Sequence, residues 1–293
     1  MAFQTEPLHP LFGAVVTGVD LRDPPTPALR AAIDAAMDQY AVLVLHDQHL
    51  SDEQQLAFGR ALGPLEDRPA QVGMEKQRLK HAELVDISNL EIDDTLLPAD
   101  DRRRMFNLGN QLWHTDSSFK RTPAKYSMLH ARVIPPSGGE TEFADMRAAW
   151  DALPADTRER IAPMVCDHSL IYSRALLGFD AFTESERAGF APVPQRLVRR
   201  HPGSGRRSLF LAAHIGTIHG MPRPEAMMLI RNLTEHATQR EFVYRHQWRE
   251  HDLVIWDNRC TMHRGLTYDD KRYKRDMRRV TLTDVAPTLA QPA

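Results

Sequence analysis

The sequence is poor in cysteine and lacks any long apolar run. Only Cys166 and Cys260 occur among 293 residues, which is too few for a disulfide framework and fits a reducing compartment. No stretch approaches the roughly 18 consecutive apolar residues of a membrane-spanning helix. The first residues, MAFQTEPLHPLFGAVV, lack the basic start and the apolar core of a signal peptide. We therefore expect a cytoplasmic protein that does not act on a membrane.

An excess of charge of one sign is missing as well. The formal net charge is −2, so no general attraction to nucleic acid or to an anionic membrane is expected. There is no glycine-rich turn from strand to helix of the kind that binds dinucleotides or phosphates. The nearest lookalike, HPGSGRR at 201–207, lies between two apolar runs and predicts a hairpin turn.

The composition that is present is that of an ordinary globular protein, with 42% hydrophobic and 26% charged residues. Helices are predicted at 26–40, where Thr26 is a plausible N-cap, and at 51–63, which begins at Ser51 and ends at Gly63. Apolar residues at helical spacing predict two further helices near 146–162 and 223–237.

Many short apolar runs between these helices predict strands. They lie at 13–21, 41–47, 125–134, 141–146, 169–174, 208–214, 241–248, 252–258 and 278–284. Short strands separated by Gly and Pro turns are typical of an antiparallel sandwich or barrel. We therefore predict a mostly β fold with flanking helices, in a single domain that spans residues 1–293.

One long segment, from about 66 to 108, is polar and irregular except for the apolar stretch ELVDISNL at 83–90. A segment of this length without a clear period is more often a functional lid or insertion than a linker. We predict that it is a lid over the substrate.

The sequence NQLWHTDSSF at 110–119 contains a His-x-Asp pair, His114 and Asp116. With 14 His and 24 Asp, about one such pair is expected by chance, so the pair alone decides little. Far along the chain, His263 follows the apolar strand predicted at 252–258. Two imidazoles and one carboxylate on one face of an iron ion leave positions for a bidentate co-substrate and dioxygen. The alternative is that these are hydrogen-bonded polar residues of a strand end and a turn.

Two further features favour the metal site. The basic segment RYKRDMRR at 272–279 leads into an apolar strand, and arginine presents a planar fork of donors that suits carboxylates. Most of its charges could equally form a solvated surface. The second feature is the Pro/Gly turn at 135–140 in front of Thr141, whose hydroxyl can donate a hydrogen bond.

Taken together, these residues resemble the TauD/TfdA group of Fe(II)- and 2-oxoglutarate-dependent dioxygenases. The resemblance covers nearly the whole chain, through the segments at 9–23, 50–66, 110–119, 135–154 and 236–265 and the closing arginine cluster. Within the group the chain is most similar to the 2,4-dichlorophenoxyacetate branch. The resemblance implies a double-stranded β-helix, the jelly roll of cupin-like proteins.

Position by position, the resemblance implies that His114, Asp116 and His263 ligate Fe(II). It places Thr141 and Arg275 where the family binds 2-oxoglutarate. The substrate-binding positions that it implies are Arg279, which would meet the acidic group of the substrate, Asn110, His214 and, in the lid, Asn89, with Lys76 and Lys80 as further lid contacts.

The reaction that the resemblance implies is hydroxylation of a small acid with 2-oxoglutarate and O2 as co-substrates, which releases succinate and CO2. For an aryloxyacetate, hydroxylation beside the ether oxygen gives a hemiacetal that collapses to a phenol and glyoxylate. The alternatives are a dioxygenase for taurine or another sulfonate or alkyl sulfate, and a non-catalytic jelly-roll protein that binds a small acid. A homo-oligomer is possible, as is common in this family.

Overall fold

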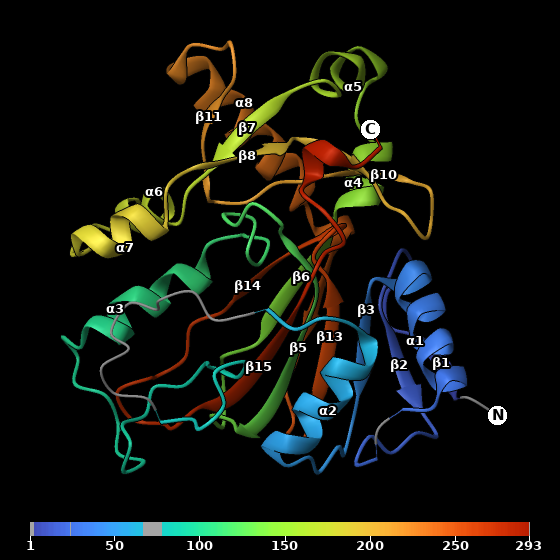
Figure 1. Cartoon of the computed structure of the whole chain (residues 1–293), viewed down its shortest axis with the longest axis vertical. Coiled ribbons are helices and arrows are strands. Elements are labelled where there is room, and N and C mark those ends of the chain that lie inside the picture. Colours follow the sequence, from blue (N-terminus) through green and yellow to red (C-terminus); the bar gives the residue numbers. More distant parts are fainter. Residues whose placement is uncertain (1–2, 24, 67–77, 293) are drawn as a thin grey trace.

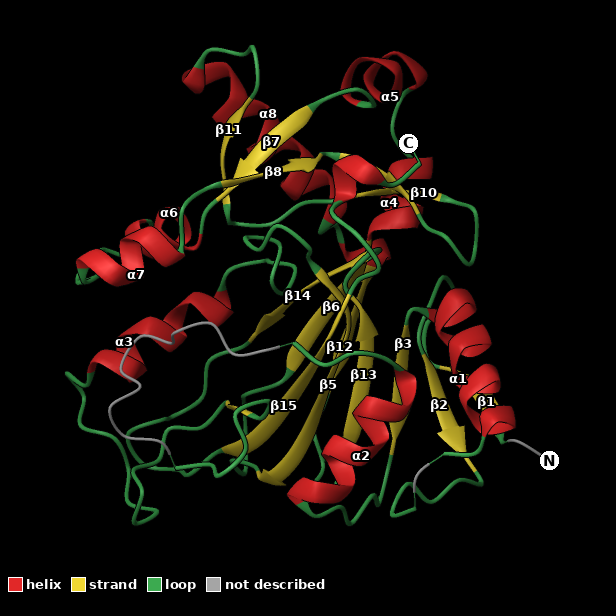
Figure 2. Cartoon of the chain, in the orientation of Figure 1, coloured by secondary structure: helices red, strands yellow, loops and turns green. Residues whose placement is uncertain are grey.

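The computed structural model describes residues 3–23, 25–66 and 78–292 (Figure 1). It has a mixed α/β fold with several sheets, in which strands occupy the centre and helices lie around them (Figure 2). In this part of the chain, no helix is long and apolar enough to cross a membrane.

The largest sheet has seven strands in the order β1-β2-β3-β13-β5-β15-β4, and its pairs are antiparallel except for β2 with β3. The strands are β1 (Gln4–Pro7), β2 (Ala14–Thr17), β3 (Val42–Leu45), β4 (Val85–Asp86), β5 (Ala124–Val133), β13 (Leu253–Asp257) and β15 (Asp276–Thr283). Alternate side chains of a strand face opposite sides of the sheet, so Leu43 and Leu45 pack on one side and Val42 and Val44 on the other.

Helices α1 (Pro27–Tyr40) and α2 (Asp52–Leu62) cover the side to which Leu43 points (Figure 1). Both begin as predicted, because the Thr26 side chain accepts a hydrogen bond from Leu29 N and Ser51 forms a capping box with Gln54. The helix predicted to end at Gly63 stops one residue earlier, with Gly63 as its C-cap.

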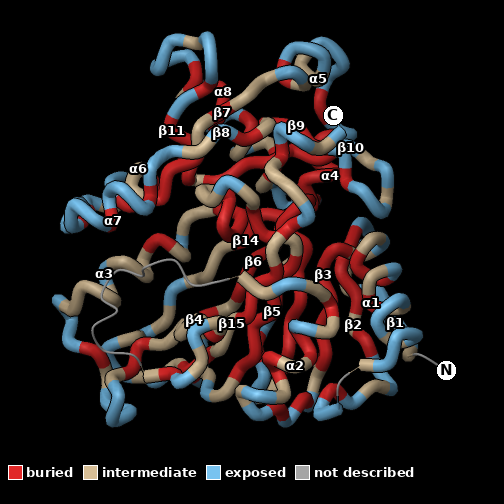
Figure 3. Tube along the Cα trace, viewed as in Figure 1, coloured by how far each residue is buried: buried red, intermediate tan, exposed pale blue. Residues whose placement is uncertain are grey.

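The other side of the large sheet faces a three-stranded sheet, β12 (Val243–His246), β6 (Thr141–Asp145) and β14 (Thr261–Gly265). Val44, Leu129, Trp256 and Phe143 belong to one buried cluster between the two sheets. The strands of this region form the buried centre of the molecule in Figure 3. Two of the residues that the sequence pattern singled out lie on β14 and β15: His263 on the former and Arg279 on the latter.

Beyond the small sheet lies a second apolar cluster, built on two small sheets and several helices. The strands are β11 (Ile215–Ile218), β7 (Val165–His168) and β8 (Val193–Arg196) in one sheet, and β9 (Val198–Arg200) and β10 (Arg207–Leu209) in the other. The helices are α4 (Met146–Asp151), α5 (Ala155–Ile161) and α8 (Arg223–Ala237). The remaining elements are α3 (Arg102–Asn107), α6 (Leu170–Ala175), α7 (Glu184–Gly189) and the 3-10 turns η1 (Leu108–Gln111), η2 (Arg240–Phe242) and η3 (Thr288–Ala290).

Several local predictions are confirmed, the strand predicted at 208–214 ends already at Leu209, and one prediction is wrong. The turn at 201–207 joins the antiparallel strands β9 and β10, as a hairpin should. The helical pattern at 146–162 divides into α4 and α5 because Pro154 breaks the hydrogen-bond ladder between them. The strand expected at 169–174 is instead helix α6, because Ser169 caps it by accepting a hydrogen bond from Tyr172 N.

Candidate metal and substrate site

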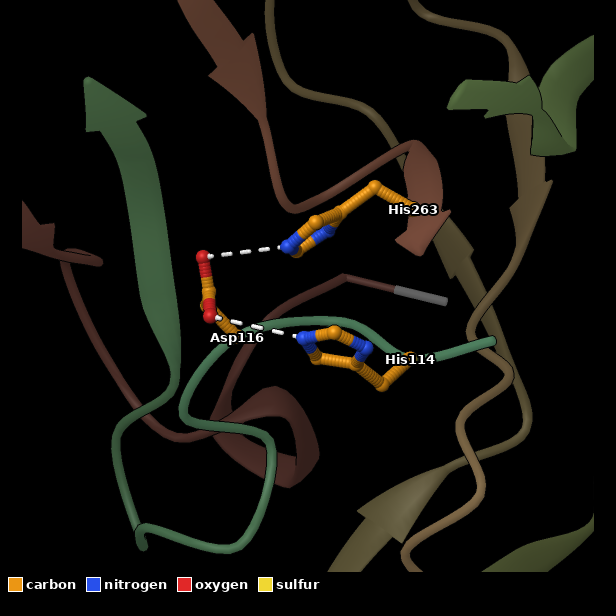
Figure 4. A group of neighbouring side chains, drawn as sticks. All are labelled: His114, Asp116 and His263. Carbon is orange, nitrogen blue, oxygen red and sulfur yellow. Dashed lines mark ion pairs between the residues drawn. The ribbon is translucent and has the colours of Figure 1, made fainter. Parts of the chain in front are cut away.

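The three metal-ligating candidates meet in space (Figure 4). His114 and His263 pair as an isolated antiparallel bridge, with His114 N 3.0 Å from His263 O and His263 N 2.8 Å from His114 O. One donor atom from each of His114, Asp116 and His263 lies within 4.8 Å of the other two, and all three residues are buried. The bridge therefore brings residues that are about half the chain apart onto one small site.

The surroundings of His114 and His263 favour the neutral form of each imidazole, which is the form that binds a metal ion. His114 Nδ1 lies 2.7 Å from the carbonyl oxygen of Leu112, a contact in which the nitrogen donates, so Nε2 keeps its lone pair. Burial lowers the pKa of both His114 and His263. Their Nε2 atoms lie 3.9 and 3.7 Å from the Asp116 carboxylate, a spacing that a metal ion between them would bridge.

Asp116 is held as a carboxylate in a fixed orientation. Burial by itself would raise its pKa, but the charge of Arg279, with the two imidazoles and a hydrogen bond from Ser127, keeps the pKa at about 2. Arg279 Nη1 donates to Oδ1 at 2.5 Å, and Ser127 Oγ donates to Oδ2 at 2.7 Å. Asn258 accepts from the backbone N of Asp116 and donates to Ser127 Oγ, which closes a ring of hydrogen bonds. Two neutral nitrogens and one oriented carboxylate are a donor set that fits a divalent iron site.

Replacing Ser127 with alanine is expected to weaken metal binding about 10- to 100-fold, since an outer-shell partner of a ligating carboxylate would be lost. Titration of the metal-free protein with Mn(II), followed by calorimetry, measures the change. The exposed Ser185 provides the matched control, Ser185→Ala. Equal affinities of the Ser127 variant and the wild type would contradict the orienting role.

A cavity of about 920 Å³, counted out to its open mouth, adjoins the triad. Predicted site residues on its wall are His114 and His263 of the triad and Asn89, Asn110, Thr141, Arg275 and Arg279. Apolar side chains on the wall are Ile87, Leu108, Leu129, Trp256 and Leu266, and the remaining lining includes the ion pair of Arg104 with Asp270. Residues predicted from five separate segments of sequence therefore surround one space.

Arg275 lies in this cavity without an acidic partner among the described residues. Its guanidinium is removed from bulk water, which lowers the pKa of Arg275 to about 10. Nearby, Trp248 Nε1 donates to Thr141 Oγ1 at 3.0 Å, so the hydroxyl hydrogen of Thr141 is free to donate elsewhere. An unpaired cation and a free hydroxyl donor on one wall are suited to a carboxylate ligand.

Asn89 and His214 occupy different settings. Asn89 lines the cavity, but its amide donates to the carbonyls of Asp270 and Tyr273 and accepts from Arg275 N, so it holds the loop that carries Arg275. His214 is not on the cavity wall; its ring centroid lies 6.1 Å from that of His114, and its Nδ1 pairs with Ser173 Oγ. Lys80 also lies off the wall, and Lys76 lies outside the described residues.

Some residues that shape the site gave no signal in the sequence. Ser127, Trp248 and Asn258 orient Asp116 or Thr141, yet each is a single polar or aromatic residue in a strand or turn. No motif links them to the triad along the chain. A second buried group, His201 with Asp257 and Cys260, also clusters at metal-ligand spacing. Its carboxylate is already occupied by Arg259 and His201, and burial raises the pKa of the Cys260 thiol far above neutrality, so it is an internal ion pair.

Comparisons with known proteins agree with this geometry. The family described as "Taurine catabolism dioxygenase TauD, TfdA family" matches residues 4–281. The chain is 48% identical over 286 residues to an alpha-ketoglutarate-dependent 2,4-dichlorophenoxyacetate dioxygenase of Cupriavidus pinatubonensis, covering 98% of this chain and 99% of the relative. It is 40% identical to an (S)-phenoxypropionate/alpha-ketoglutarate-dioxygenase of Sphingobium herbicidovorans, over 92% of this chain and 91% of the relative.

Among solved structures, the crystal structure of AAD-2 with Mn(II) and N-oxalylglycine superposes with a TM-score of 0.92 at 51% identity. The alignment covers 98% of this chain and all of that one. The chain belongs to the TauD/TfdA family and is an α-ketoglutarate-dependent dioxygenase.

Proposed function

We propose that the protein is an Fe(II)- and 2-oxoglutarate-dependent dioxygenase that cleaves an aryloxyacetate such as 2,4-dichlorophenoxyacetate. The observation that carries the proposal is the pairing, on one cavity, of a buried two-His-one-Asp set with the unpaired guanidinium of Arg275. The substrate class follows from the 48% identity, over almost the full length, to a dioxygenase of that acid.

His114, Asp116 and His263 would hold the iron, with the tautomer of His114 fixed by Leu112 O and the carboxylate turned toward it by Ser127. Bound there, iron supplies the redox chemistry that couples oxidative decarboxylation of 2-oxoglutarate to hydroxylation of the substrate. Arg275 and the free hydroxyl donor of Thr141 would bind the carboxylate of 2-oxoglutarate remote from the metal. The role of these residues is to fix both ends of the co-substrate in one orientation.

The substrate side is assigned to Arg279, Asn110, His214 and Asn89. Arg279 donates to Asp116 through Nη1 and lines the cavity, so the remainder of its guanidinium would bind the acidic group of the substrate. Asn110 lies on the same wall four residues before His114. His214 lies behind His114, and Asn89 acts through the loop at 270–275.

The overall reaction balances with one O2. 2-Oxoglutarate gives succinate and CO2, the carbon next to the ether oxygen of the substrate gains a hydroxyl, and the hemiacetal breaks its C–O bond to the aryloxy group. The aryloxy oxygen takes the hydroxyl proton and leaves as the phenol, and the two-carbon fragment leaves as glyoxylate. The cavity walls of Ile87, Leu108, Leu129 and Leu266 would exclude water from this step.

We propose likewise that the framework is a double-stranded β-helix in a single domain, since the seven-stranded sheet and the sheet β12-β6-β14 face each other around the triad. Of the segment predicted as a lid at 66–108, residues 67–77 lie outside the described residues; the part at 78–108 would form the substrate lid, because Ile87, Ser88, Asn89 and Leu108 lie on the cavity wall. A homo-oligomer in the cytoplasm stays a prediction.

Succinate release with Fe(II), 2-oxoglutarate and O2 tests the function, measured side by side with 2,4-dichlorophenoxyacetate, two aryloxypropionates, taurine and an alkyl sulfate. We expect 2,4-dichlorophenoxyacetate to give the highest kcat/KM. A higher value for taurine or the alkyl sulfate would replace the aryloxyacetate proposal by the sulfonate or sulfate-ester alternative. Absence of stimulated succinate release by every acid would favour a non-catalytic binding protein.

A further inference from the structure

Helix α6 carries a buried arginine whose charge is not neutralised. Arg174 is 5% exposed, and no carboxylate of the described residues pairs with it. Its Nη1 donates only to Ser173 Oγ, at 3.3 Å, and its Nε is buried without a hydrogen-bond partner in the described part of the chain. Burying an unpaired guanidinium is unfavourable, so a position of this kind points to an anion that arrives from outside.

Arg174 is not itself a lining residue of the cavity, but its guanidinium packs against a segment that is, the turn η1. A β-carbon added at Gly109 would collide with Arg174 Cζ, so the guanidinium packs directly on the backbone of η1. The flanking Leu108 and Asn110 both line the cavity. Only a residue without a side chain at position 109 leaves room for this approach, which places the cation behind the same wall as Asn110.

The charge of Arg174 and a hydrogen bond through Ser173 connect it to His114 of the metal triad and to His214. Its positive charge acts on both His114 and His214, and burial together with the charge of Arg279 lowers the pKa of Arg174 to about 10. Ser173, the neighbour of Arg174 in α6, accepts from the arginine and pairs with His214 Nδ1. Arg174 therefore belongs to the electrostatic surroundings of the site, although it is far from the triad in sequence.

The immediate surroundings of Arg174 are aromatic. Its Cζ lies 4.4 Å from the centroid of the Phe106 ring. Phe106 and Phe119 pack on a buried cluster made of Leu170, Phe179, Phe182 and Phe190, and Phe119 meets His214 edge to face at 5.0 Å. A cation set among aromatic rings suits a ligand that is both anionic and aromatic.

Two acids enter the proposed reaction, and two arginines of this region, Arg174 and Arg275, have no acidic partner in the described part of the chain. Arg275 is assigned to 2-oxoglutarate, and Arg279 already donates to Asp116. Building on the proposed function, we infer that Arg174 and Arg279 together bind the carboxylate of the aromatic substrate. The carboxylate of the substrate would then be held by two arginines. Arg279 shares its charge with Asp116, whereas Arg174 would neutralise the substrate carboxylate.

Binding to the catalytically inert complex tests the inference. The full chain is loaded with Mn(II) and N-oxalylglycine, and calorimetry measures the affinity for 2,4-dichlorophenoxyacetate and for its neutral amide, 2,4-dichlorophenoxyacetamide. The variants are Arg174→Gln and, as a matched control, Arg187→Gln, whose exposed guanidinium lies 6.0 Å from the Phe182 ring of the same aromatic cluster. N-oxalylglycine affinity reports whether each variant keeps the fold and the metal site.

We expect Arg174→Gln to bind the acid at least about 10-fold more weakly than the wild type, since a charge-assisted hydrogen bond is lost. Its affinities for the amide and for N-oxalylglycine should stay within about threefold of the wild type, which is the scatter expected of a small neutral change. Unchanged affinity for the acid, or an equal loss for acid and amide, would overturn the inference. Should Arg174→Gln fail to bind N-oxalylglycine, Arg174→Lys replaces it in the experiment. An Arg174→Lys variant that binds the acid no better than the amide would also overturn the inference.

A different result of the same binding experiment would contradict the proposed function. If the wild-type complex itself binds neither the acid nor the amide, the aryloxyacetate assignment is wrong, whatever the Arg174 variants do. If the wild type binds the acid and Arg174→Gln binds it equally well, the substrate class stands and the role of Arg174 is wrong.

Discussion

Replacing His114 with alanine is expected to lower substrate-dependent succinate formation by more than about 100-fold, because losing a ligand should exceed the 10- to 100-fold cost of losing an outer-shell partner. His114 supplies one of the two imidazoles of the triad, and its backbone pairs with His263, so Asp116 and His263 alone would leave the metal without one of its three ligands. Mn(II) affinity, measured by calorimetry on the metal-free protein, should fall together with the activity.

The control for this change is His219→Ala. His219 is exposed, pairs with Asp167 and does not line the cavity. Both activity and Mn(II) affinity of this variant should equal those of the wild type. Coupled turnover that survives in His114→Ala with an unchanged fold would contradict the metal assignment.

Replacing Arg275 with glutamine is expected to raise the dissociation constant of 2-oxoglutarate about 100-fold. Truncating one member of a buried charge pair costs about 2–5 kcal/mol, and 1.4 kcal/mol corresponds to tenfold in affinity. Arg275 has no acidic partner among the described residues, so its removal leaves no orphaned carboxylate in the protein. The loss should therefore appear in co-substrate binding rather than in stability, measured by calorimetry with the Mn(II)-loaded protein.

Arg272 lies three residues earlier and is exposed, which makes Arg272→Gln the matched control. We expect it to bind 2-oxoglutarate as the wild type does. If Arg275→Gln keeps its affinity for 2-oxoglutarate but binds the aromatic acid more weakly, Arg275 binds the substrate rather than 2-oxoglutarate, and its assignment is wrong.

Local signals in the sequence predicted much of the fold. Thr26, Ser51 and the turn at 201–207 each act through neighbours a few residues away, and each element appears where expected. The segment at 169–174 shows the limit of such signals, because a short apolar run can form a strand or a buried helix. Its Ser169 cap, which decides for α6, is equally common in turns.

Some residues of the candidate site could be predicted from the sequence and others could not. His114, Asp116 and His263 form a donor set that can be recognised in the sequence, and the resemblance to a family then implied that all three ligate Fe(II). Ser127, Asn258 and Arg174 had no such signal, because a serine, an asparagine or an arginine gains its meaning only from what packs beside it. For Arg174 that partner is the backbone of Gly109, a contact between segments 65 residues apart in the chain.

The stoichiometry of products formed by the wild-type protein decides whether it is a dioxygenase that cleaves an aryloxyacetate. With 2,4-dichlorophenoxyacetate, Fe(II), 2-oxoglutarate and O2, we expect 2,4-dichlorophenol, glyoxylate and succinate in equal amounts, and none of them when Fe(II) is left out. Succinate that accumulates without phenol, or phenol that forms without 2-oxoglutarate, would contradict it.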